Sequence, residues 1–174
     1  RDGLNGVDGL HEPHAVTVSP DGAHVYVAGW ADNAVTVFSR NNTTGQLTFV
    51  QEVKNGAAGV NGITGPNSIA VSPDGANVYV VGEFDDAVAL FDRDPQTGKL
   101  TSSGLVQDGV GGVSGMGGAL AIALSADGTS AYVAAELDDA VATFSRSSST
   151  MRPARRLPTP ETAVSTASSP CSPG

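Results

Sequence analysis

The stretch Ser19-Pro20-Asp21-Gly22, followed closely by Val25-Tyr26-Val27, is the landmark of this 174-residue chain. It returns twice with the same internal spacing, as Ser72-Pro73-Asp74-Gly75 with Val78-Tyr79-Val80 and as Ser125-Ala126-Asp127-Gly128 with Ala131-Tyr132-Val133. Each step is 53 residues. An ungapped comparison of residues 14–53 with residues 67–106 gives 20 identities in 40 positions. The sequence is therefore built on a 53-residue repeat, and a repeat of this length indicates a repeat architecture.

Each repeat contains four short segments with the composition of β-strands. In the first repeat they cover residues 15–19, 25–29, 34–39 and 47–53 and are rich in Val, Tyr, Phe and Thr. Between the first two, Pro-Asp-Gly presets a negative φ at Pro and allows a positive φ at Gly, which predicts a tight hairpin. The second segment is apolar at consecutive positions, which indicates a sheet covered on both faces. Such sheets, repeated at a fixed period, predict the blades of a β-propeller.

The predicted fold is all-β: a β-propeller segment of about three four-stranded antiparallel blades that form an incomplete ring. The repeat places blade 1 with its leading loop at residues 1–53, blade 2 at residues 54–106 and a partial blade 3 at residues 107–146. The remaining residues, 147–174, are rich in Ser and Pro and predict a disordered tail. Three origins of this tail stay open: a natural linker, a frame-shifted reading of a continuing repeat, or a short functional peptide.

Charge and composition exclude several kinds of partner. Nine Lys and Arg against 18 Asp and Glu give a net charge of −9 and predict no binding of nucleic acid or of an anionic membrane. No stretch approaches the ~20 apolar residues of a membrane-spanning helix. The single cysteine, Cys171, excludes an internal disulfide and a cysteine-based zinc site. An arc of three blades would expose an apolar face at each end, so we expect the remaining blades of a larger ring, or another copy of the chain, to cover these faces.

The repeat resembles the bacterial YVTN-type and lactonase-type β-propellers, the latter including 6-phosphogluconolactonase-like proteins. The resemblance is carried by Val18-Ser19-Pro20-Asp21-Gly22 with Val25-Tyr26-Val27, by Asp32, Ala34-Val35 and Phe38-Ser39-Arg40, and by Thr44-Gly45-x-Leu47-Thr48. These motifs build blades, so they specify the fold more strongly than the activity. The resemblance implies a propeller, usually of seven blades, that sometimes acts as a lactone hydrolase. It also implies that such proteins are often exported, which favours an extracellular or periplasmic location.

One histidine-rich loop holds the candidate catalytic residues. In a propeller, the loops that lead into each innermost strand share a rim with the turns between the second and third strands. The first such loop ends in His11-Glu12-Pro13-His14, at a spacing similar to that in lactonase-type propellers. There a neutral His14 could act as a general base or a metal ligand, with Glu12 as its partner. The matching positions in the other repeats are Asn67 and Leu120, so a plain capping or surface role for His14 stays open.

Further candidates for ligand binding belong to the same predicted rim. They are His11, Trp30, Asn67, Glu83, Asp85, Asp86, Glu136, Asp138 and Asp139. The clustered carboxylates would suit Ca²⁺, but they also suit turns, and no Asp-x-Asp-x-Asp-Gly loop is present. We therefore expect no metal site and no cofactor, and Ca²⁺ stays open as the weaker alternative. We expect the repeated tyrosines, Tyr26, Tyr79 and Tyr132, to pack between blades.

Two functions fit this sequence. Asp and Gly recur at the rim in every repeat, which favours a non-catalytic scaffold that binds a protein or glycan partner there. The unlike polar residues His11, Glu12 and His14 favour the alternative, a fragment of a lactone hydrolase of the 6-phosphogluconolactonase-like type that binds a small molecule at the rim. In that reading, water attacks a lactone carbonyl with His14 and Glu12 assisting. The sequence leaves the choice between scaffold and enzyme open.

Overall fold

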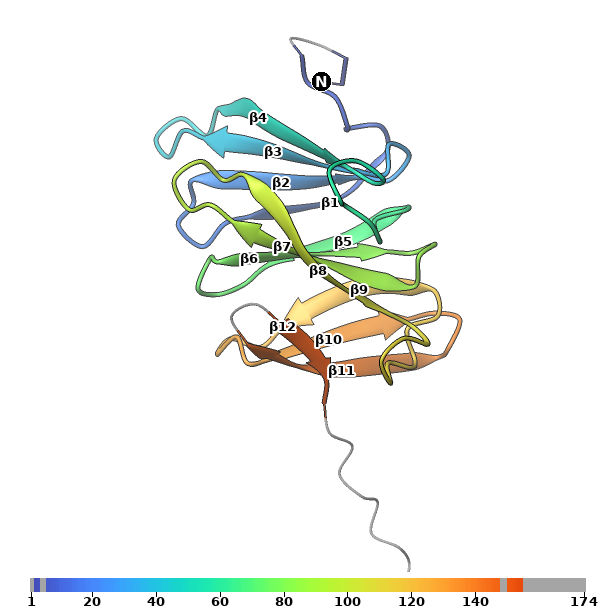
Figure 1. The fold of residues 1–174 in the computed structure, drawn as a ribbon. Helices are drawn as coiled ribbons and strands as arrows, with labels where there is room; N and C mark the ends of the chain where they lie inside the picture. The colour runs from blue at the N-terminus through green and yellow to red at the C-terminus, as the bar shows by residue number, and fades with distance from the viewer. Residues whose placement is uncertain (1, 4–5, 148–149, 155–174) are drawn as a thin grey trace, which may run out of the picture.

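The computed structural model describes residues 2–3, 6–147 and 150–154, and this part of the chain forms twelve β-strands and no helix. The strands make three separate four-stranded antiparallel sheets, one for each repeat, stacked face to face (Figure 1). This arrangement confirms the prediction of an all-β arc of three propeller blades. Among the described residues, no helix long and apolar enough to cross a membrane occurs.

Each blade contains four strands in chain order. Blade 1 consists of β1 (Pro13–Val18), β2 (His24–Gly29), β3 (Ala34–Arg40) and β4 (Leu47–Lys54). Blade 2 consists of β5 (Pro66–Val71), β6 (Asn77–Gly82), β7 (Ala87–Arg93) and β8 (Leu100–Gln107). Blade 3 consists of β9 (Ala119–Leu124), β10 (Ser130–Ala135), β11 (Ala140–Ser147) and β12 (Thr150–Pro153). Each sheet is a simple meander, and the first strands of adjacent blades lie next to one another.

The last strand of blade 3 corrects the predicted boundary between blade and tail. The repeat pattern stops after Arg146, which predicts a partial blade. Instead β12 pairs with β11 and completes the sheet. The reason is Met151, which pairs with Arg146 as Leu100 pairs with Arg93 in blade 2. Met151 is buried in the core between blades 2 and 3, as Leu100 is buried in the core between blades 1 and 2. The rest of the predicted tail, residues 155–174, lies outside the described residues.

The Ser-Pro-Asp-Gly motif closes the first hairpin of each blade, as predicted. In blade 1 the amide of Gly22, with a φ of +72°, donates to the carbonyl of Ser19 at 2.8 Å. The amide of Ala23 donates to Asp21 Oδ1 at 3.0 Å, and the amide of His24 donates to Ser19 Oγ at 3.0 Å. The same bonds recur in blades 2 and 3, so this turn is a fixed part of the repeat.

The apolar core lies between the blades. We call the side of a blade that packs against the next blade its trailing face, and the side that packs against the preceding blade its leading face. One core joins the trailing face of blade 1 to the leading face of blade 2, and a second core joins blades 2 and 3 in the same way. The first includes Tyr26, Val35, Val37, Ile69, Val78, Val80 and Phe91, and the second includes Tyr79, Val81, Val88, Leu90, Ile122, Val133 and Phe144.

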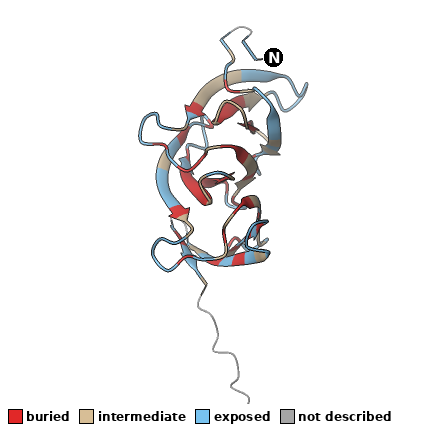
Figure 2. Ribbon diagram, turned by 90° about the vertical axis from the view of Figure 1, so that its right-hand side faces the viewer, coloured by how far each residue is buried: buried red, intermediate tan, exposed pale blue. Residues whose placement is uncertain are grey.

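The two end faces of the arc are partly uncovered. On the trailing face of blade 3, Tyr132 is 42% exposed and Val141 is 64% exposed, whereas Tyr79 is 1% exposed at the equivalent place in blade 2. On the leading face of blade 1, Val16 is 67% exposed, whereas its equivalent Ile69 is 8% exposed. Figure 2 shows buried residues along the strands inside the stack and exposed residues in the loops and on parts of the strands. The predicted packing of the tyrosines therefore holds for two blades, and the third tyrosine lies on an open face.

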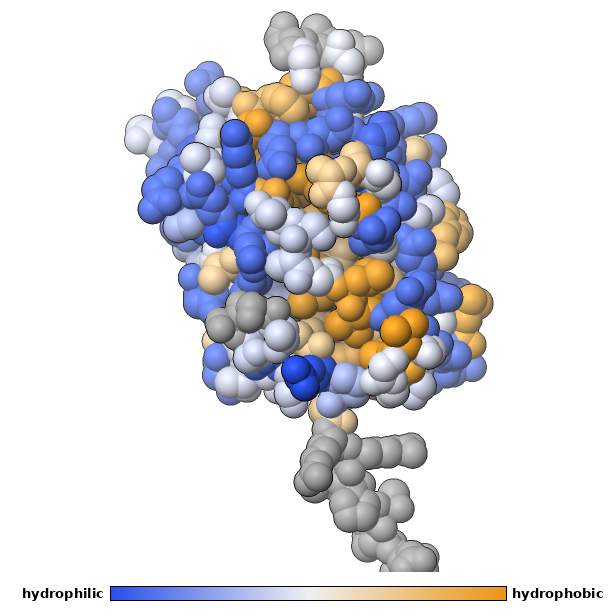
Figure 3. Space-filling model, in the orientation of Figure 1, coloured by the Kyte–Doolittle hydropathy of each residue, from blue (hydrophilic) through white to orange (hydrophobic). Residues whose placement is uncertain are grey.

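A further apolar patch lies on the outer side of the arc. Figure 3 shows hydrophobic side chains gathered there, over the end of β8 and the loop that leads into blade 3. Leu105 and Val110 are exposed at this patch and border a hollow of about 660 Å³ that Val113, Met151 and Pro153 also line. The hollow lies at the outer seam between blades 2 and 3.

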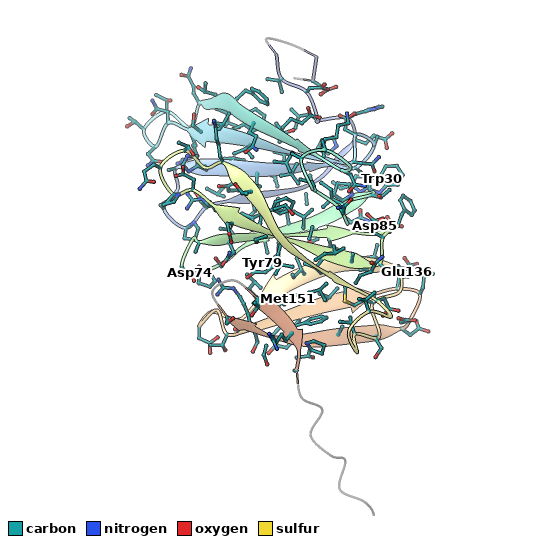
Figure 4. All side chains as sticks on the ribbon, viewed as in Figure 1. Trp30, Asp74, Tyr79, Asp85, Glu136 and Met151 are labelled. Carbon is teal, nitrogen blue, oxygen red and sulfur yellow. The ribbon has the colours of Figure 1, made fainter. Side chains whose placement is uncertain are left out.

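The strands end at two rims. The loop rim carries the β2–β3, β6–β7 and β10–β11 turns and the loops that lead into β1, β5 and β9. The hairpin rim carries the Ser-Pro-Asp-Gly turns and the turns between the third and fourth strands of each blade. Figure 4 shows Trp30, Asp85 and Glu136 at the loop rim and Asp74 at the hairpin rim, on the opposite side of the arc.

Candidate functional site at the loop rim

A β-bulge marks the start of each innermost strand. The pairing of β1 with β2 skips His14, and the pairing of β5 with β6 skips Asn67. The pairing of β9 with β10 skips Leu120 in the same way. A bulge turns the side chain of its extra residue out of the regular alternation and is frequent beside functional sites. These three side chains therefore occupy one repeated, re-aimed position close to the loop rim.

A chain of hydrogen bonds joins His14 of blade 1 to Glu83 of blade 2. Asn67 Nδ2 donates to Glu83 Oε2 at 2.5 Å, and Asn67 Oδ1 lies 2.6 Å from Nδ1 of His14. The indole nitrogen of Trp30 donates to the same oxygen of Glu83 at 3.3 Å. Four residues that the sequence named separately thus form one network across two blades.

Aromatic contacts hold this network from one side. The imidazole of His14 stacks on Trp30 with 5.4 Å between ring centroids and 19° between planes. Phe84 packs its ring at 63° to Trp30, with centroids 5.5 Å apart. The close fit requires a glycine at position 65, because a Cβ on Gly65 would lie 2.7 Å from the Phe84 ring and 3.1 Å from Trp30 Nε1.

Glu83 sets which nitrogen of His14 carries a proton. An ionised carboxylate only accepts hydrogen bonds, so Asn67 turns its NH₂ group to Glu83 and its carbonyl oxygen to His14. His14 then donates through Nδ1, and the Nε2 of the neutral ring keeps its lone pair. Such a nitrogen can take a proton from water or from a hydroxyl group. The imidazole is thus oriented by an amide and a carboxylate, and a catalytic role for His14 stays a prediction.

The network is confined to blades 1 and 2. In blade 3, Leu120 stands at the position of Asn67, and Glu136 stands at the position of Glu83. An aliphatic side chain cannot bridge a carboxylate to the inner strand, and Glu136 is exposed. The structure therefore places Glu136 on the same rim without joining it to the cluster.

Glu12 and His11 contribute to the site through their backbone. The amide of Trp30 donates to the carbonyl of Glu12 at 3.0 Å, and the carbonyl of His11 accepts from the next amide at 3.2 Å. Among the described residues, the His14 side chain forms its hydrogen bond with Asn67 and forms none with Glu12. Glu12 and His11 thus hold the Trp30 turn against β1. A direct catalytic role for Glu12 stays a prediction.

The acidic candidates of blades 2 and 3 accept hydrogen bonds from backbone amides. Asp85 Oδ2 accepts from Thr64 at 2.7 Å, and Asp138 accepts from its own leading loop at 2.7 Å. Asp86 Oδ1 accepts from Gly118 of the next blade at 2.7 Å. These bonds tie the turns to the loops and explain why acids recur there. Their part in ligand binding stays a prediction.

Three acids of the first loop region also lie together. Asp2, Asp8 and Asp32 bring carboxylate oxygens within 4.8 Å of one another. Each carboxylate accepts a hydrogen bond from a nearby loop amide, at 2.8 to 3.0 Å. These hydrogen bonds give each carboxylate a part in the shape of the loop, and the expectation that no metal binds here stays a prediction.

At the hairpin rim, a buried arginine joins blades 1 and 2. Arg93, at the end of β7, donates through Nε to the hydroxyl of Tyr26 at 2.7 Å and through Nη2 to Asp21 Oδ2 at 2.7 Å. Nη2 also lies 2.9 Å from Nδ1 of His24, and Nη1 donates to the carbonyl of Gly75 at 2.9 Å. We call this set of contacts a clasp. Burial alone would raise the pKa of Asp21, but hydrogen bonds from the turn and from Arg93 hold it far below its usual range.

A second clasp joins blades 2 and 3 with the same spacing along the chain. Arg146 donates to the hydroxyl of Tyr79 at 2.5 Å, to Asp74 Oδ2 at 3.2 Å and to Asn77 Oδ1 at 3.0 Å. The hydrogen bond from Ser72, with help from Arg146, lowers the pKa of Asp74 to about 2. The clasps were not predicted from the sequence, although Arg40, Arg93 and Arg146 recur at the 53-residue period.

Stacked four-stranded meanders with adjacent innermost strands define a β-propeller. The family profile described as lactonase, 7-bladed beta-propeller, matches residues 5–109 and again residues 57–163. The chain belongs to this lactonase family.

Two similar curated proteins are both named 6-phosphogluconolactonase. The one from Bacillus subtilis is 31% identical over 87 residues, which is 50% of this chain and 23% of that protein. The one from Formosa agariphila is 30% identical over 88 residues, which is 49% of this chain and 23% of that protein. The chain thus matches about a quarter of the length of these relatives.

Solved structures share the fold. The periplasmic gluconolactonase of Pseudomonas aeruginosa is 25% identical with a TM-score of 0.69, over 84% of this chain and 39% of that chain. A putative 6-phosphogluconolactonase of Bacteroides fragilis is 22% identical with a TM-score of 0.69, over 86% of this chain and 39% of that chain. The names of these proteins support the lactone hydrolase of the sequence analysis better than the binding scaffold.

Proposed function

We propose that the chain supplies the general-base part of a lactone-hydrolysing site at its loop rim. His14 Nε2 takes a proton from a water molecule whose oxygen attacks the carbonyl carbon of the lactone. The ring C–O bond then breaks, and the leaving oxygen receives the proton back from His14. Lactone and water become one hydroxy acid, and the imidazole returns to its neutral form.

The hydrogen-bonded chain from His14 through Asn67 to Glu83 carries this proposal. When His14 gains a proton, its Nδ1–H bond to Asn67 strengthens, and the carboxylate of Glu83 polarises the amide in the favourable direction. Trp30 keeps the imidazole in place by stacking. Phe84, which is 60% exposed beside it, offers an apolar surface for the carbon skeleton of the substrate.

The charge of the rim favours a neutral sugar lactone over a phosphorylated one. Acidic side chains follow the second strand of every blade, and the chain as a whole carries a net charge of −9. A phosphate group would be repelled by this field, whereas an uncharged aldonolactone would not be. The proposed substrate class is therefore a neutral aldonolactone such as gluconolactone.

Steady-state hydrolysis of gluconolactone and 6-phosphogluconolactone by the 174-residue chain tests the proposal. We expect catalysis above the spontaneous rate, a higher kcat/KM for the neutral lactone, and a loss of about 100-fold in His14→Ala. The matched control is His24→Asn, which removes a histidine from the hairpin rim and introduces the residue that blade 2 carries there as Asn77. Equal turnover in His14→Ala and the unchanged chain, or no turnover in either, would contradict the proposal.

A further inference from the structure

The innermost strands carry backbone amides that point away from their own sheets. β1, β5 and β9 each stand at one end of the strand order and lie next to one another along the inner side of the arc. In blade 2 the amide of Ser72 donates to the carbonyl of Asn77 at the start of β6, at 2.9 Å. Bonded and non-bonded pairs alternate along an antiparallel ladder, and the register between β5 and β6 is regular from this pair back to Ile69. The amide of Ile69 therefore points away from β6, to the inner side.

The corresponding amide of blade 3 has an acceptor. The amide of Ile122, which stands 53 residues after Ile69, donates to Ser68 Oγ of blade 2 at 3.2 Å. This bond runs in the direction that the pairing alternation requires, away from the sheet of blade 3. A hydroxyl group of the preceding blade thus occupies the donor at the seam between blades 2 and 3.

The seam between blades 1 and 2 has no such hydroxyl. Ala15 stands at the position of Ser68, and its methyl group packs against the core between blades 1 and 2. Within the described part of the chain, no side chain accepts a hydrogen bond from the amide of Ile69. Because a backbone amide is a strong donor, this one is available to an acceptor on a ligand.

This donor belongs to the same two strands as the His14–Asn67 pair. Ala15 directly follows His14 in β1, and Ile69 follows Asn67 by two residues in β5. His14 Nδ1 and Asn67 Oδ1 are 2.6 Å apart, so the two strands meet at this level. Two residues of a strand span about 7 Å. A general base and an oxyanion donor need a comparable separation, because the attacking water and the carbonyl group lie between them.

We propose that the amide of Ile69 is the oxyanion donor of the lactone-hydrolysing site, an inference that rests on the proposed function. The water oxygen bonds to the carbonyl carbon, its proton goes to His14 Nε2, and the π-electron pair of the carbonyl moves onto the carbonyl oxygen. The Ile69 N–H donates to this oxygen while it is negative. The electron pair then re-forms the carbonyl as the ring C–O bond breaks, and the leaving oxygen takes the proton from His14. An amide fixed in a strand is oriented before the charge develops, which lowers the barrier.

The repeat itself supplies a variant that occupies the donor. Ala15→Ser places a hydroxyl where Ser68 accepts from Ile122, so we expect it to accept from the Ile69 amide. The kcat for gluconolactone should fall about 100-fold with KM nearly unchanged, because the donor acts mainly on the charged state. The matched control, Ala121→Ser, makes the same change at the corresponding exposed position of blade 3 and should leave kcat unchanged.

Amide hydrogen exchange followed by nuclear magnetic resonance tests the donor without turnover. The Ile69 amide should exchange faster than the Ile122 amide in the unchanged chain and more slowly in Ala15→Ser, whereas Ser68→Ala should release Ile122. Gluconolactam, with NH in place of the ring oxygen, keeps the lactone carbonyl and resists hydrolysis. It should protect the Ile69 amide in the unchanged chain and not in Ala15→Ser. The amide spectrum also shows whether each variant is folded.

The outcomes separate this inference from the proposed function. Full kcat in a folded Ala15→Ser variant, an Ile69 amide that exchanges as slowly as that of Ile122, or a lactam that leaves Ile69 unprotected would each overturn the oxyanion donor, and His14 would remain the general base. No turnover in the unchanged chain, together with protection of Ile69 by the lactam, would overturn the proposed function and retain Ile69 as a donor that binds a lactone carbonyl.

Discussion

The two rims of the arc use polar side chains in opposite ways. At the hairpin rim the tyrosine, the aspartate and the arginine of each clasp recur in successive blades, although the fourth position changes from His24 to Asn77, and each set holds the next blade through Arg93 or Arg146. At the loop rim the bulge position changes from His14 to Asn67 to Leu120 along the three blades. A position on which the stacking of every blade depends keeps its residue type. A position that does not contribute to stacking can change its residue type from blade to blade, so different polar side chains can meet in one site.

The largest effect expected from this contrast is on stability. Arg93→Ala removes a buried side chain and leaves Tyr26 and Asp21 without their partner, so the free energy of unfolding falls by about 3 kcal/mol. His14→Ala at the loop rim changes it by about 0.5 kcal/mol or less, because His14 is exposed. Urea denaturation of the two variants measures both values. A similar loss in the free energy of unfolding in both variants would contradict this difference between the two rims.

The next effect separates two glycines of the hairpin rim. Gly45 and Gly98 hold the same turn position with φ of +75° and +73°, but only Gly98 lies against the preceding blade, where an added Cβ would meet the His24 ring. Gly98→Ala should therefore lower the free energy of unfolding by about 2 kcal/mol more than Gly45→Ala, for which only the backbone strain applies. Thermal denaturation at low protein concentration compares them. Equal losses in the free energy of unfolding would show that the Gly98 turn can shift away from His24 without disturbing the clasp.

The fold was predictable to the extent that it rests on local signals. The repeat, its turns and the strand composition predict three four-stranded blades. The boundary of blade 3 was wrong because β12 has little strand character, and its place depends on one buried side chain, Met151, supplied by tertiary packing. Local composition carries no information about such a contact.

The site was predictable only as a set of separate residues. His14, Trp30, Asn67 and Glu83 follow from the repeat and the expected rim. Their contact depends on the bulges and on side-chain orientation, which periodicity does not encode. The sequence paired His14 with Glu12, its near neighbour in the chain, whereas the hydrogen bond comes from a residue 53 positions away. The clasps were missed for the same reason, since their partners are separated by 67 and 72 residues.

A smaller effect concerns activity at the loop rim. Asn67→Leu gives blade 2 the residue that blade 3 has at its bulge and breaks the bridge from His14 to Glu83. We expect kcat/KM for gluconolactone to fall about 10-fold, because the imidazole loses its orienting acceptor while keeping its Nε2. The control is Leu120→Ala at the corresponding bulge of blade 3, which should leave kcat/KM unchanged. An Asn67→Leu variant with full activity would show that the bridge has no part in the reaction.

The smallest effect distinguishes the two clasps by pH. Burial, and then the charge of Arg93, lower the pKa of His24 in the first clasp, whereas the second clasp has Asn77 in its place. In the unfolded chain His24 takes up a proton below its ordinary value of about 6.5, and in the folded chain only at lower pH. Stability is therefore full above about pH 6.5 and decreases as the pH falls below it. Since the carboxylates with lowered pKa values reduce stability chiefly below about pH 4, the change expected between pH 6.5 and pH 5 is assigned to His24. Urea midpoints should fall from pH 8 to pH 5 in the unchanged chain and stay level in His24→Asn; an equal fall in both would assign the loss to groups outside the clasp.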